Sequence, residues 1–481
     1  MDAKEPGTIR KETVMNSKSS LSLFRPPLKA AWFEDVLQAA VPARIQGRVW
    51  SIRGATVSAA GLSIPVGSIC EIQRGNGENL EAEVVGFDGD RTILAPMDTS
   101  HGIRPGDQVI LKAGCRAIRI SEQLLGKVID ADGKPLDDSG ESKSAAKIAL
   151  NHKPPDAMDR PPIDTILPTS VKAIDAFLTL GKGQRIGIFA GSGVGKSTLL
   201  GMLARGTQAD VVVIGLIGER GREVREFIER DLGEEGQRRA ITVVATSDQP
   251  ALRRLQAAKT ATAIAEFYRS EGKDVLLLMD SVTRFAMAQR EIGLAAGEVP
   301  ATRGYPPSVF AMLPQLVERT GRSTTGSITG IYTVLVDGDD TNEPISDALR
   351  GLLDGHIHLS RSIASRNRYP AIDILPSLSR LQSQLVTPQH AKAAAELRQL
   401  MAVFRDNEDL ISIGAYKTGS SPLIDRAIAM RAGIEALLTQ DTKSKSNYEA
   451  TVEQLMKLAN TAGMSTTGTN ATTGTSSGNR S

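Results

Sequence analysis

A glycine-rich run that ends in lysine and serine carries the clearest chemical signal in the sequence. Glycines let backbone N–H groups approach a phosphate closely, and the start of a helix adds partial positive charge. Lys196 can then reach the β- and γ-phosphates of a nucleotide, and the Ser197 hydroxyl can bind Mg²⁺. Ala190 replaces the first glycine of the GxxxxGK[ST] pattern and is small enough for that position. The predicted phosphate-binding loop comprises Gly191, Ser192, Gly193, Val194, Gly195, Lys196, Ser197 and Thr198.

Two carboxylates follow apolar runs that are typical of buried strands. Asp280 comes directly after the run Val275–Met279, and Glu219 lies just past the run Val211–Leu216. The carboxyl ends of parallel strands face the crevice where ligands bind in open α/β sheets. We expect Asp280 to hold Mg²⁺ through water and Glu219 to orient or deprotonate an attacking water. The position of Glu219 alone leaves a second interpretation open, the solvated start of a charged helix.

The elements needed to position these residues are those of an α/β fold. From Pro161 to about Val386, apolar strands alternate with helical patterns, which predicts a mostly parallel sheet covered by helices. The glycine run lies between a strand and a helix, the context that a phosphate-binding loop requires. The predicted strands are Ile186–Ala190, Val211–Leu216, Ile241–Ala245, Val275–Met279 and Ser327–Leu335, with a further candidate at His356–Leu359.

The region before this sheet has the pattern of a small β-barrel. Residues 43–118 contain short β-rich runs separated by turn signals such as Gly75-Asn76-Gly77. No catalytic cluster is evident there, so we assign this region a role in assembly. The predicted strands are Arg44–Ile52, Ser68–Gln73, Glu81–Phe87, Thr92–Pro96 and Gln108–Leu111.

Helical patterns and polar extensions account for the rest of the chain. Helices are predicted at 389–405, 424–438 and 448–458, with a turn or short strand at Asp409–Gly414. Residues 23–42 predict an amphipathic helix that docks on its own domain, with binding to a partner or a membrane as the alternative. The polar ends, 1–22 and 465–481, predict disorder. The domains expected are therefore a helix and barrel at 23–118, the nucleotide domain at 119–386 and a helical domain at 387–464.

The composition is that of an ordinary globular protein. The chain has 481 residues, 41% of them hydrophobic and 23% charged, with a formal net charge of +2, so no global field favours nucleic acid or anionic membrane. Cys70 and Cys115 match no metal spacing, and His356 and His358 lack a third ligand nearby in sequence, so we expect no dedicated metal cluster from them. We expect a protein without a signal peptide or membrane span, located in a reducing cytosol.

Several long motifs together resemble the flagellar and type III secretion export ATPases, relatives of the catalytic subunit of rotary ATP synthases. The resemblance covers roughly residues 25–440. It implies a barrel domain, a RecA-like nucleotide domain and a helical C-terminal domain, assembled as a six-membered ring with sites between subunits. The motifs are the phosphate loop, GERGREV at 218–224, LLLMDS at 276–281, RGYPPSVFAMLPQLVERTG at 303–321, YTVLVDGDD at 332–340, LDGHIHLSR at 353–361 and YPAIDILPSLSR at 369–380.

The resemblance also assigns roles to single residues. It implies that Glu219 is the catalytic glutamate, and that Arg220 lies near the γ-phosphate. Arg380 matches an arginine finger, which would act on the nucleotide of the neighbouring subunit, and Tyr369 matches an aromatic residue that packs on adenine. Lys196, Ser197 and Asp280 match the phosphate and Mg²⁺ ligands, so the expected cofactors are ATP and Mg²⁺.

The function that follows is ATP hydrolysis by a ring ATPase that energises flagellar protein export. A virulence type III secretion ATPase and a non-catalytic nucleotide-binding subunit of a rotary assembly are the alternatives, and Glu219 argues against the second. An RNA-translocating ring is disfavoured, because the barrel has few aromatics for base stacking and the net charge is near zero. The expected partners are identical subunits, stalk, regulator and gate proteins of the export apparatus, export substrates and their chaperones. We expect no nucleic acid partner, and a location at the inner face of the membrane, with peripheral membrane association left open.

Overall fold

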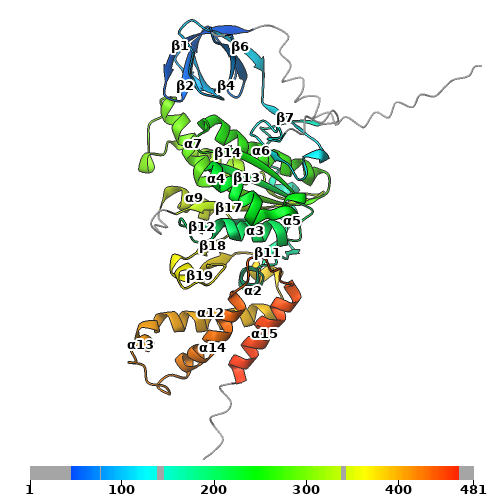
Figure 1. Ribbon diagram of the computed structural model, residues 1–481, viewed down its shortest axis with the longest axis vertical. Helices are drawn as coiled ribbons and strands as arrows, with labels where there is room; N and C mark the ends of the chain where they lie inside the picture. Colours follow the sequence, from blue (N-terminus) through cyan, green and yellow to red (C-terminus); the bar gives the residue numbers. More distant parts are fainter. Residues whose placement is uncertain (1–44, 76, 138–145, 337–342, 465–481) are drawn as a thin grey trace, which may run out of the picture. The chain divides into compact units, whose positions relative to one another are not determined.

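The computed structural model of the protein describes residues 45–75, 77–137, 146–336 and 343–464 (Figure 1). The predicted polar extension 1–22, the predicted amphipathic helix in 23–42 and the predicted disordered tail 465–481 lie outside these residues. Among the described residues, no helix is both long and apolar enough to cross a membrane.

A closed six-stranded barrel occupies the first part of the described chain, as predicted. Its strand order is β1-β2-β5-β4-β3-β6, and neighbouring strands are antiparallel. Alternate residues of β4, such as Leu80, Ala82 and Val84, point into the barrel core, which explains the period-two pattern of the sequence. The prediction missed β2. The strands are β1 (Gln46–Arg53), β2 (Thr56–Ala60), β3 (Ile69–Gln73), β4 (Asn79–Asp88), β5 (Arg91–Pro96) and β6 (Gln108–Ala113).

The predicted mostly parallel sheet is confirmed. Its order is β19-β18-β12-β17-β15-β13-β14-β8, with β16 paired to β17. All pairs are parallel except β18–β19 and β16–β17. The strands are β8 (Val128–Ile129), β12 (Arg185–Ala190), β13 (Val211–Glu219), β14 (Ala240–Thr246), β15 (Asp274–Asp280), β16 (Gly321–Arg322), β17 (Ser327–Leu335), β18 (Gly355–Leu359) and β19 (Ile372–Ser379), and two small ribbons pair β7 (Ala117–Ile120) with β9 (Ala146–Ala149) and β10 (Ile166–Leu167) with β11 (Leu180–Gly181).

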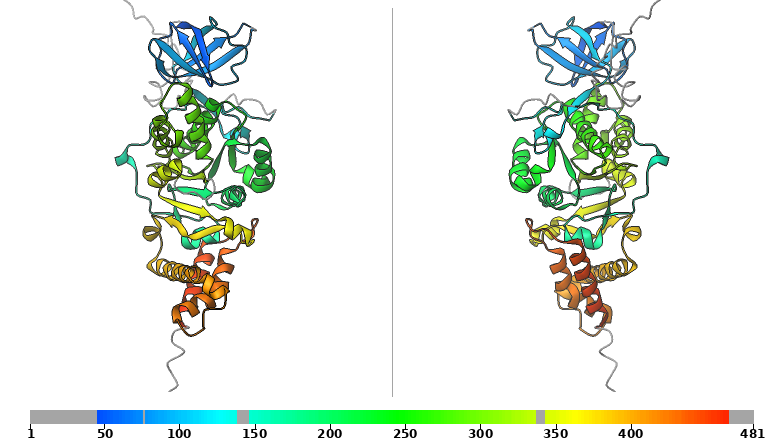
Figure 2. Two further views of the ribbon diagram at one scale, coloured as in Figure 1. Left: turned by 90° about the vertical axis from the view of Figure 1, so that its left-hand side faces the viewer. Right: turned by 90° about the vertical axis from the view of Figure 1, so that its right-hand side faces the viewer.

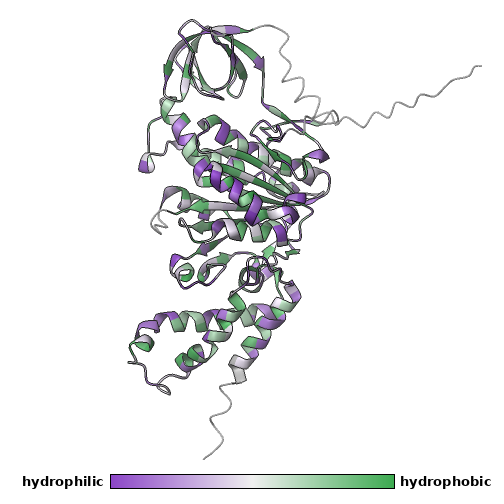
Figure 3. Ribbon diagram, viewed as in Figure 1, coloured by the Kyte–Doolittle hydropathy of each residue, from purple (hydrophilic) through white to green (hydrophobic). Residues whose placement is uncertain are grey.

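Helices cover both faces of this sheet (Figure 2). In β13, Val211 and Val213 belong to one apolar core and Val212 and Ile214 to the other, so the strand is buried on both sides. This explains why it is a continuous apolar run, seen as green ribbon in Figure 3. The helices that contribute to the first core are α6 (Ala251–Ser270), α7 (Val282–Ala295), α8 (Pro307–Val317) and α9 (Pro344–Leu352). On this sheet, the second core includes residues of α2 (Lys172–Phe177), α3 (Lys196–Gly206), α4 (Gly221–Glu226) and η3 (Phe227–Leu232), and η3 continues into α5 (Gly233–Arg238).

The last part of the described chain is helical, as predicted. The main helices are α12 (Pro388–Asp406), α14 (Pro422–Leu438) and α15 (Tyr448–Met464), and they pack on one another through residues such as Leu397 and Ile434. The predicted turn or short strand at Asp409–Gly414 is wrong, because α13 (Glu408–Ser412) forms one helical turn there. Two acidic residues at its start, Glu408 and Asp409, favour a helix N-terminus. The remaining short helices are η1 (Glu122–Leu124), η2 (Ala157–Asp159), η4 (Thr302–Gly304), α10 (Arg361–Ser365) and α11 (Gln382–Leu385).

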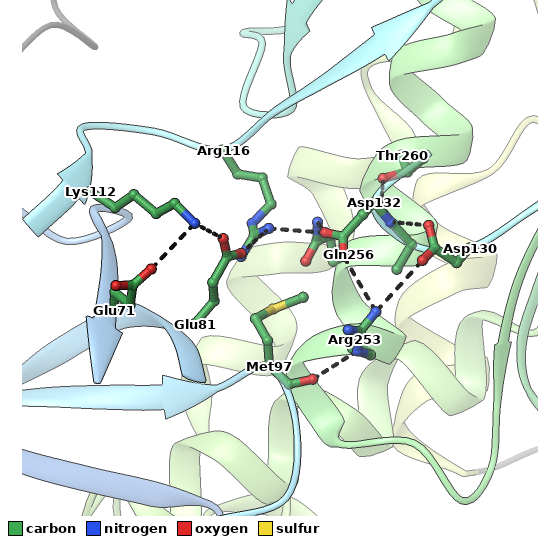
Figure 4. Close-up of polar contacts among 11 residues, drawn as sticks. Glu71, Glu81, Met97, Lys112, Arg116, Asp130, Asp132, Arg253, Gln256 and Thr260 are labelled. Atoms are coloured by element: carbon green, nitrogen blue, oxygen red, sulfur yellow. Dashed lines mark hydrogen bonds and ion pairs between the residues drawn. The ribbon is translucent and has the colours of Figure 1, made fainter. Parts of the chain in front are cut away.

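A polar network connects the barrel strands with the nucleotide domain (Figure 4). The Arg116 guanidinium Nη1 lies 3.0 Å from Glu81 on β4 and 2.9 Å from Asp132, which follows β8. Arg253 on α6 donates to the backbone oxygen of Met97, just after β5, and pairs with Asp132. Both arginine side chains are largely buried, which strengthens these charged contacts between the barrel and the nucleotide domain.

Candidate active site

The glycine-rich run forms a loop between β12 and α3, the context predicted for phosphate binding. Gly193 and Gly195 have φ values of +79° and +86°, a backbone conformation that side chains with a Cβ rarely adopt. Lys196 is the first residue of α3, so the free N–H groups of that helix start point toward the loop. Ser197 and Thr198, in the same first turn, are half-buried. A Cβ on Gly193 would meet no atom within 4 Å, which leaves open space beside the loop.

Lys196, Glu219 and Asp280 meet in one cluster. The Lys196 ammonium lies 2.5 Å from Asp280 Oδ1 and 3.3 Å from Glu219 Oε1. The Thr333 hydroxyl donates to the same Asp280 oxygen at 2.6 Å, and fixes the orientation of the carboxylate. Sequence reasoning placed the two acids at strand ends but did not single out Thr333, because its neighbours lie far away along the chain.

The sheet explains why these residues come together. β15 lies between β13 and β17, and Asp280 at the end of β15 pairs in register with Leu216 of β13. β13 extends beyond the predicted Leu216 and ends at Glu219, so both acids lie at the carboxyl edge. This is the edge at which open parallel sheets bind ligands.

Burial sets the protonation of the cluster. Burial, followed by the neighbouring Asp280 carboxylate and a hydrogen bond with Glu223, raises the pKa of Glu219 to about 7, although Lys196 opposes this. Burial disfavours the charged form of Lys196, but the carboxylates of Asp280 and Glu219 outweigh it and raise the pKa of the ammonium. Glu219 is therefore a carboxylate that can exchange a proton near neutral pH, as a general base requires.

The donor set fits a nucleotide with Mg²⁺. A hydroxyl at Ser197 and a carboxylate at Asp280 are oxygen ligands of the kind Mg²⁺ prefers, and Lys196 supplies a cation for phosphates. Arg284 on α7, which sequence reasoning missed, packs against Gly218, where an added Cβ would lie 2.9 Å from the Arg284 Cβ. Its Nε is shielded from solvent and has no hydrogen-bond partner among the described residues, so it can donate to an anion. The only sequence signal for it is its position four residues after Asp280.

The remaining predicted site residues lie outside this cluster. Tyr369 flanks the phosphate loop, with its Cε1 3.4 Å from the position a Cβ on Gly195 would occupy. Arg220 is 78% exposed and pairs with Glu223 at 3.0 Å, so it does not point at Lys196. Arg380 is exposed, and its described contacts are with Arg350 and Asp354.

His356 and His358 lie on β18, next to the strand that leads into the phosphate loop. The His358 ring stacks on Phe189 of β12 with centroids 5.3 Å apart, and His356 Nε2 lies 3.0 Å from the Pro376 carbonyl oxygen. Burial lowers the pKa of both imidazoles, that of His358 to about 4. Across the described ranges, no group of three or more His, Cys, Asp and Glu side chains could hold a metal ion.

Family models match three parts of the chain. The nucleotide-binding domain of the ATP synthase alpha/beta family matches residues 170–379, and the beta-barrel domain of the same family matches residues 49–111. The C-terminal domain of the type III secretion ATPase EscN matches residues 386–457.

Curated relatives match nearly the whole chain. The flagellum-specific ATP synthase of Bacillus subtilis is 51% identical over 414 residues, which cover 86% of this chain and 94% of the relative. The flagellum-specific ATP synthase of Salmonella typhimurium is 48% identical, covering 88% of this chain and 95% of the relative. The type 3 secretion system ATPase of Xanthomonas euvesicatoria is 47% identical, covering 92% and 100%.

Solved structures match the described fold as well. The assembled ATPase EscN of the enteropathogenic E. coli type III secretion system superposes with a TM-score of 0.82 at 45% identity, covering 86% of this chain and all of that one. EscN in complex with its central stalk EscO gives a TM-score of 0.78 at 44% identity, with the same coverage.

Proposed function

Because the chain belongs to the flagellar and type III secretion export ATPases, we propose that it hydrolyses ATP within a ring of identical subunits and thereby energises protein export. The observation that carries the catalytic part is the position of Glu219, 3.3 Å from Lys196 with a pKa of about 7. A nucleotide-binding subunit without turnover has no need of a carboxylate with a perturbed pKa beside its phosphate lysine.

The chain's own residues bind and orient the triphosphate. The loop N–H groups and the start of α3 accommodate the β-phosphate, and Lys196 leaves its two carboxylate partners for the β- and γ-phosphates. Ser197 and, through water, Asp280 would hold Mg²⁺, which when bound neutralises charge on the phosphates. Tyr369, which flanks the loop at Gly195, would pack against the adenine ring.

Glu219 acts on the attacking water. Its carboxylate accepts a hydrogen bond from the water, so that an oxygen lone pair faces the γ-phosphorus in line with the bond to ADP. The new P–O bond forms as the bond to the β–γ bridging oxygen breaks. ADP leaves with that electron pair, and the water proton passes to Glu219 and from there to solvent.

Arg380 is assigned to the neighbouring subunit's site. It is exposed, and its described hydrogen bonds go to the backbone oxygens of Arg350 and Asp354 rather than to the Lys196–Glu219 cluster. In a head-to-tail ring, each interface would join the Glu219 of one subunit to the Arg380 of the next. An arginine in this position stabilises transition-state charge and is worth about a thousandfold or more in rate.

Mixing two inactive variants tests this assignment. Glu219→Gln and Arg380→Ala should each be nearly inactive alone, because every interface lacks one half. Co-assembled rings should recover phosphate release, since about one interface in four is complete by random mixing. Light scattering verifies that the mixed rings have formed. If such rings stay inactive, Arg380 does not act on the site of the neighbouring subunit. Strict coupling around the ring would also silence mixed rings, and it is recognised because a few Glu219→Gln subunits would then abolish wild-type activity.

Further parts of the proposal rest on the relatives. The EscN complex with its central stalk supports a stalk protein as a partner, and the assembled EscN supports a homo-oligomer, which we take to be hexameric. We place the protein in the cytoplasm at the export apparatus, with regulator and gate proteins, substrates and chaperones as further partners. Flagellar and virulence secretion both fit, because the relatives include both kinds of ATPase. Loss of flagella on gene deletion would identify the flagellar role.

A further inference from the structure

Arg380 owes its position to a second arginine. The Arg380 Nη2 donates to the backbone oxygen of Arg350 at 2.9 Å, and its backbone N–H donates to the oxygen of Asp354 at 3.0 Å. Arg350 lies in the last turn of α9, where helix carbonyls lack partners within the helix. The Arg380 side chain therefore satisfies a free carbonyl at the end of α9. Its orientation depends on the position of that helix end.

The side chain of Arg350 in turn lies on the strand that leads into the phosphate loop. Its guanidinium carbon is 5.2 Å from the ring centroid of Phe189, which is buried and precedes Ala190 and Gly191. A cation over an aromatic face is held by electrostatic attraction and by contact area. The Arg350 Nε is shielded from solvent and has no hydrogen-bond partner among the described residues, so stacking rather than hydrogen bonding at Nε holds this part of the side chain.

A cavity lies beside this stack. It has a volume of about 540 Å³ and is lined by Phe189, Gly191, Arg350, His356 and Arg361, among others. Phe189 also stacks on His358, whose neutral imidazole does not repel Arg350. Because this side of the guanidinium opens into the cavity, no neighbouring side chain would replace its contact with Phe189 after truncation.

We infer that Arg350 is a positioning residue that ties Arg380 to the phosphate-loop strand of its own subunit, so that the finger reaches the neighbour's nucleotide in a fixed place. This inference rests on the proposed role of Arg380 between subunits. The path runs from Gly191 and Phe189 through Arg350 to Arg380. It begins at the first glycine of the phosphate loop and includes none of the residues of the Lys196–Glu219–Asp280 cluster, so we expect nucleotide binding in that subunit to be retained.

The complementation pattern of Arg350→Ala distinguishes this role from a general loss of structure. Ring-forming Arg350→Ala should bind a fluorescent ATP analogue as wild type does, while kcat falls about 10- to 100-fold, the cost expected for misplacing a catalytic group by about 1 Å. Mixed with Glu219→Gln, it should regain activity, because its intact site meets an intact finger. Mixed with Arg380→Ala, it should keep its own low rate. One variant then lacks Arg380 and the other holds it in the wrong place, so no interface receives a correctly positioned arginine.

The opposite pattern would overturn the inference. If Arg380→Ala restored the activity of Arg350→Ala, the Arg350→Ala subunit would still be presenting a functional Arg380 to its neighbour. Arg350 would then act on the nucleotide site of its own subunit. Wild-type kcat in Arg350→Ala would exclude any positioning role. If Arg350→Ala does not fold, Arg350→Met, which keeps an unbranched stem over Phe189 but lacks the guanidinium, goes through the same mixtures with the same expected pattern.

Two controls separate this inference from the proposed function. Arg361→Ala removes another arginine from the same cavity that no described hydrogen bond joins to Arg380, and should leave kcat unchanged. The pair Glu219→Gln with Arg380→Ala reports on the finger itself. If that pair is rescued but Arg350→Ala does not follow the pattern of Arg380→Ala, the positioning role fails while the finger stands. If that pair is not rescued, the proposed function fails first.

Discussion

The Glu219 carboxylate and the Lys196 ammonium face each other at the carboxyl edge of the sheet, with Oε1 and Nζ 3.3 Å apart. Asp280 holds the same ammonium more closely, at 2.5 Å. Glu219 is thus the more weakly held of the two acids, and burial keeps its pKa near neutrality. The cluster joins the cation that we propose binds the phosphates to a carboxylate that can accept a proton.

The raised pKa of Glu219 predicts how enzymatic activity decreases at acidic pH. Below pH 7, Glu219 is protonated in the free enzyme and cannot accept a proton from water, so kcat/KM should fall about tenfold per pH unit well below that point. Phosphate release measured from pH 5 to 9 provides the profile. The residual activity of Glu219→Gln should lack this decrease. A wild-type profile that stays flat down to pH 5 would show that Glu219 does not titrate in the rate-determining path.

Tyr369 predicts a separate effect on nucleotide affinity. Because its ring flanks the phosphate loop at Gly195, Tyr369→Ala should remove a stacking surface worth about 1–3 kcal/mol and raise the Kd for ATP about 10-fold. Tyr369→Phe keeps the ring and serves as the matched control, with affinity near wild type. Titration of a fluorescent nucleotide measures both variants. Unchanged affinity in Tyr369→Ala would place the adenine elsewhere.

A buried ion pair predicts a stability effect away from the site. Arg319 donates to both Glu266 oxygens, at 2.8 and 2.6 Å, and both side chains are buried. Glu266→Gln should lower the free energy of unfolding by about 3–5 kcal/mol, because it leaves a buried cation without its charge partner. Glu291→Gln, in the half-exposed pair with Arg254, should cost less than about 1 kcal/mol. Thermal melting distinguishes them, and equal shifts would contradict the argument.

The same pair has a defined pH dependence. Burial alone would raise the pKa of Glu266, but hydrogen bonds from Arg319 and His152 outweigh it and lower the pKa below the ordinary value. The stabilisation is therefore present above the unfolded-state pKa and is lost as pH falls through the lower folded-state value. The gap in melting temperature between wild type and Glu266→Gln should narrow in acid.

Much of the site could be predicted because its signals are local. A glycine loop between strand and helix is readable from neighbouring residues, and Asp280 follows a continuous apolar strand. Parallel strands have their carboxyl ends at one edge of the sheet, so this part of the prediction does not require the strand order. The same local logic found the three long helices from Pro388 onward and most barrel strands.

The remaining features depend on contacts between distant parts of the chain. Thr333 bonds Asp280 across two neighbouring strands, and Arg284 reaches the loop only because α7 packs beside Gly218. The Arg350–Phe189 stack joins residues 161 positions apart. The strand β2 was missed because it is short and rich in small residues. The helix α13 was missed because a single turn is too short to show a helical repeat of apolar residues.

The central claim is that Glu219 performs chemistry while Lys196 holds the nucleotide. The most direct measurement compares Kd for ATP with phosphate release in Glu219→Gln and Lys196→Ala. We predict that Glu219→Gln keeps wild-type affinity and loses turnover, because the amide retains the shape but cannot accept a proton. Lys196→Ala should lose both. Phosphate release by Glu219→Gln at the wild-type rate would contradict the account.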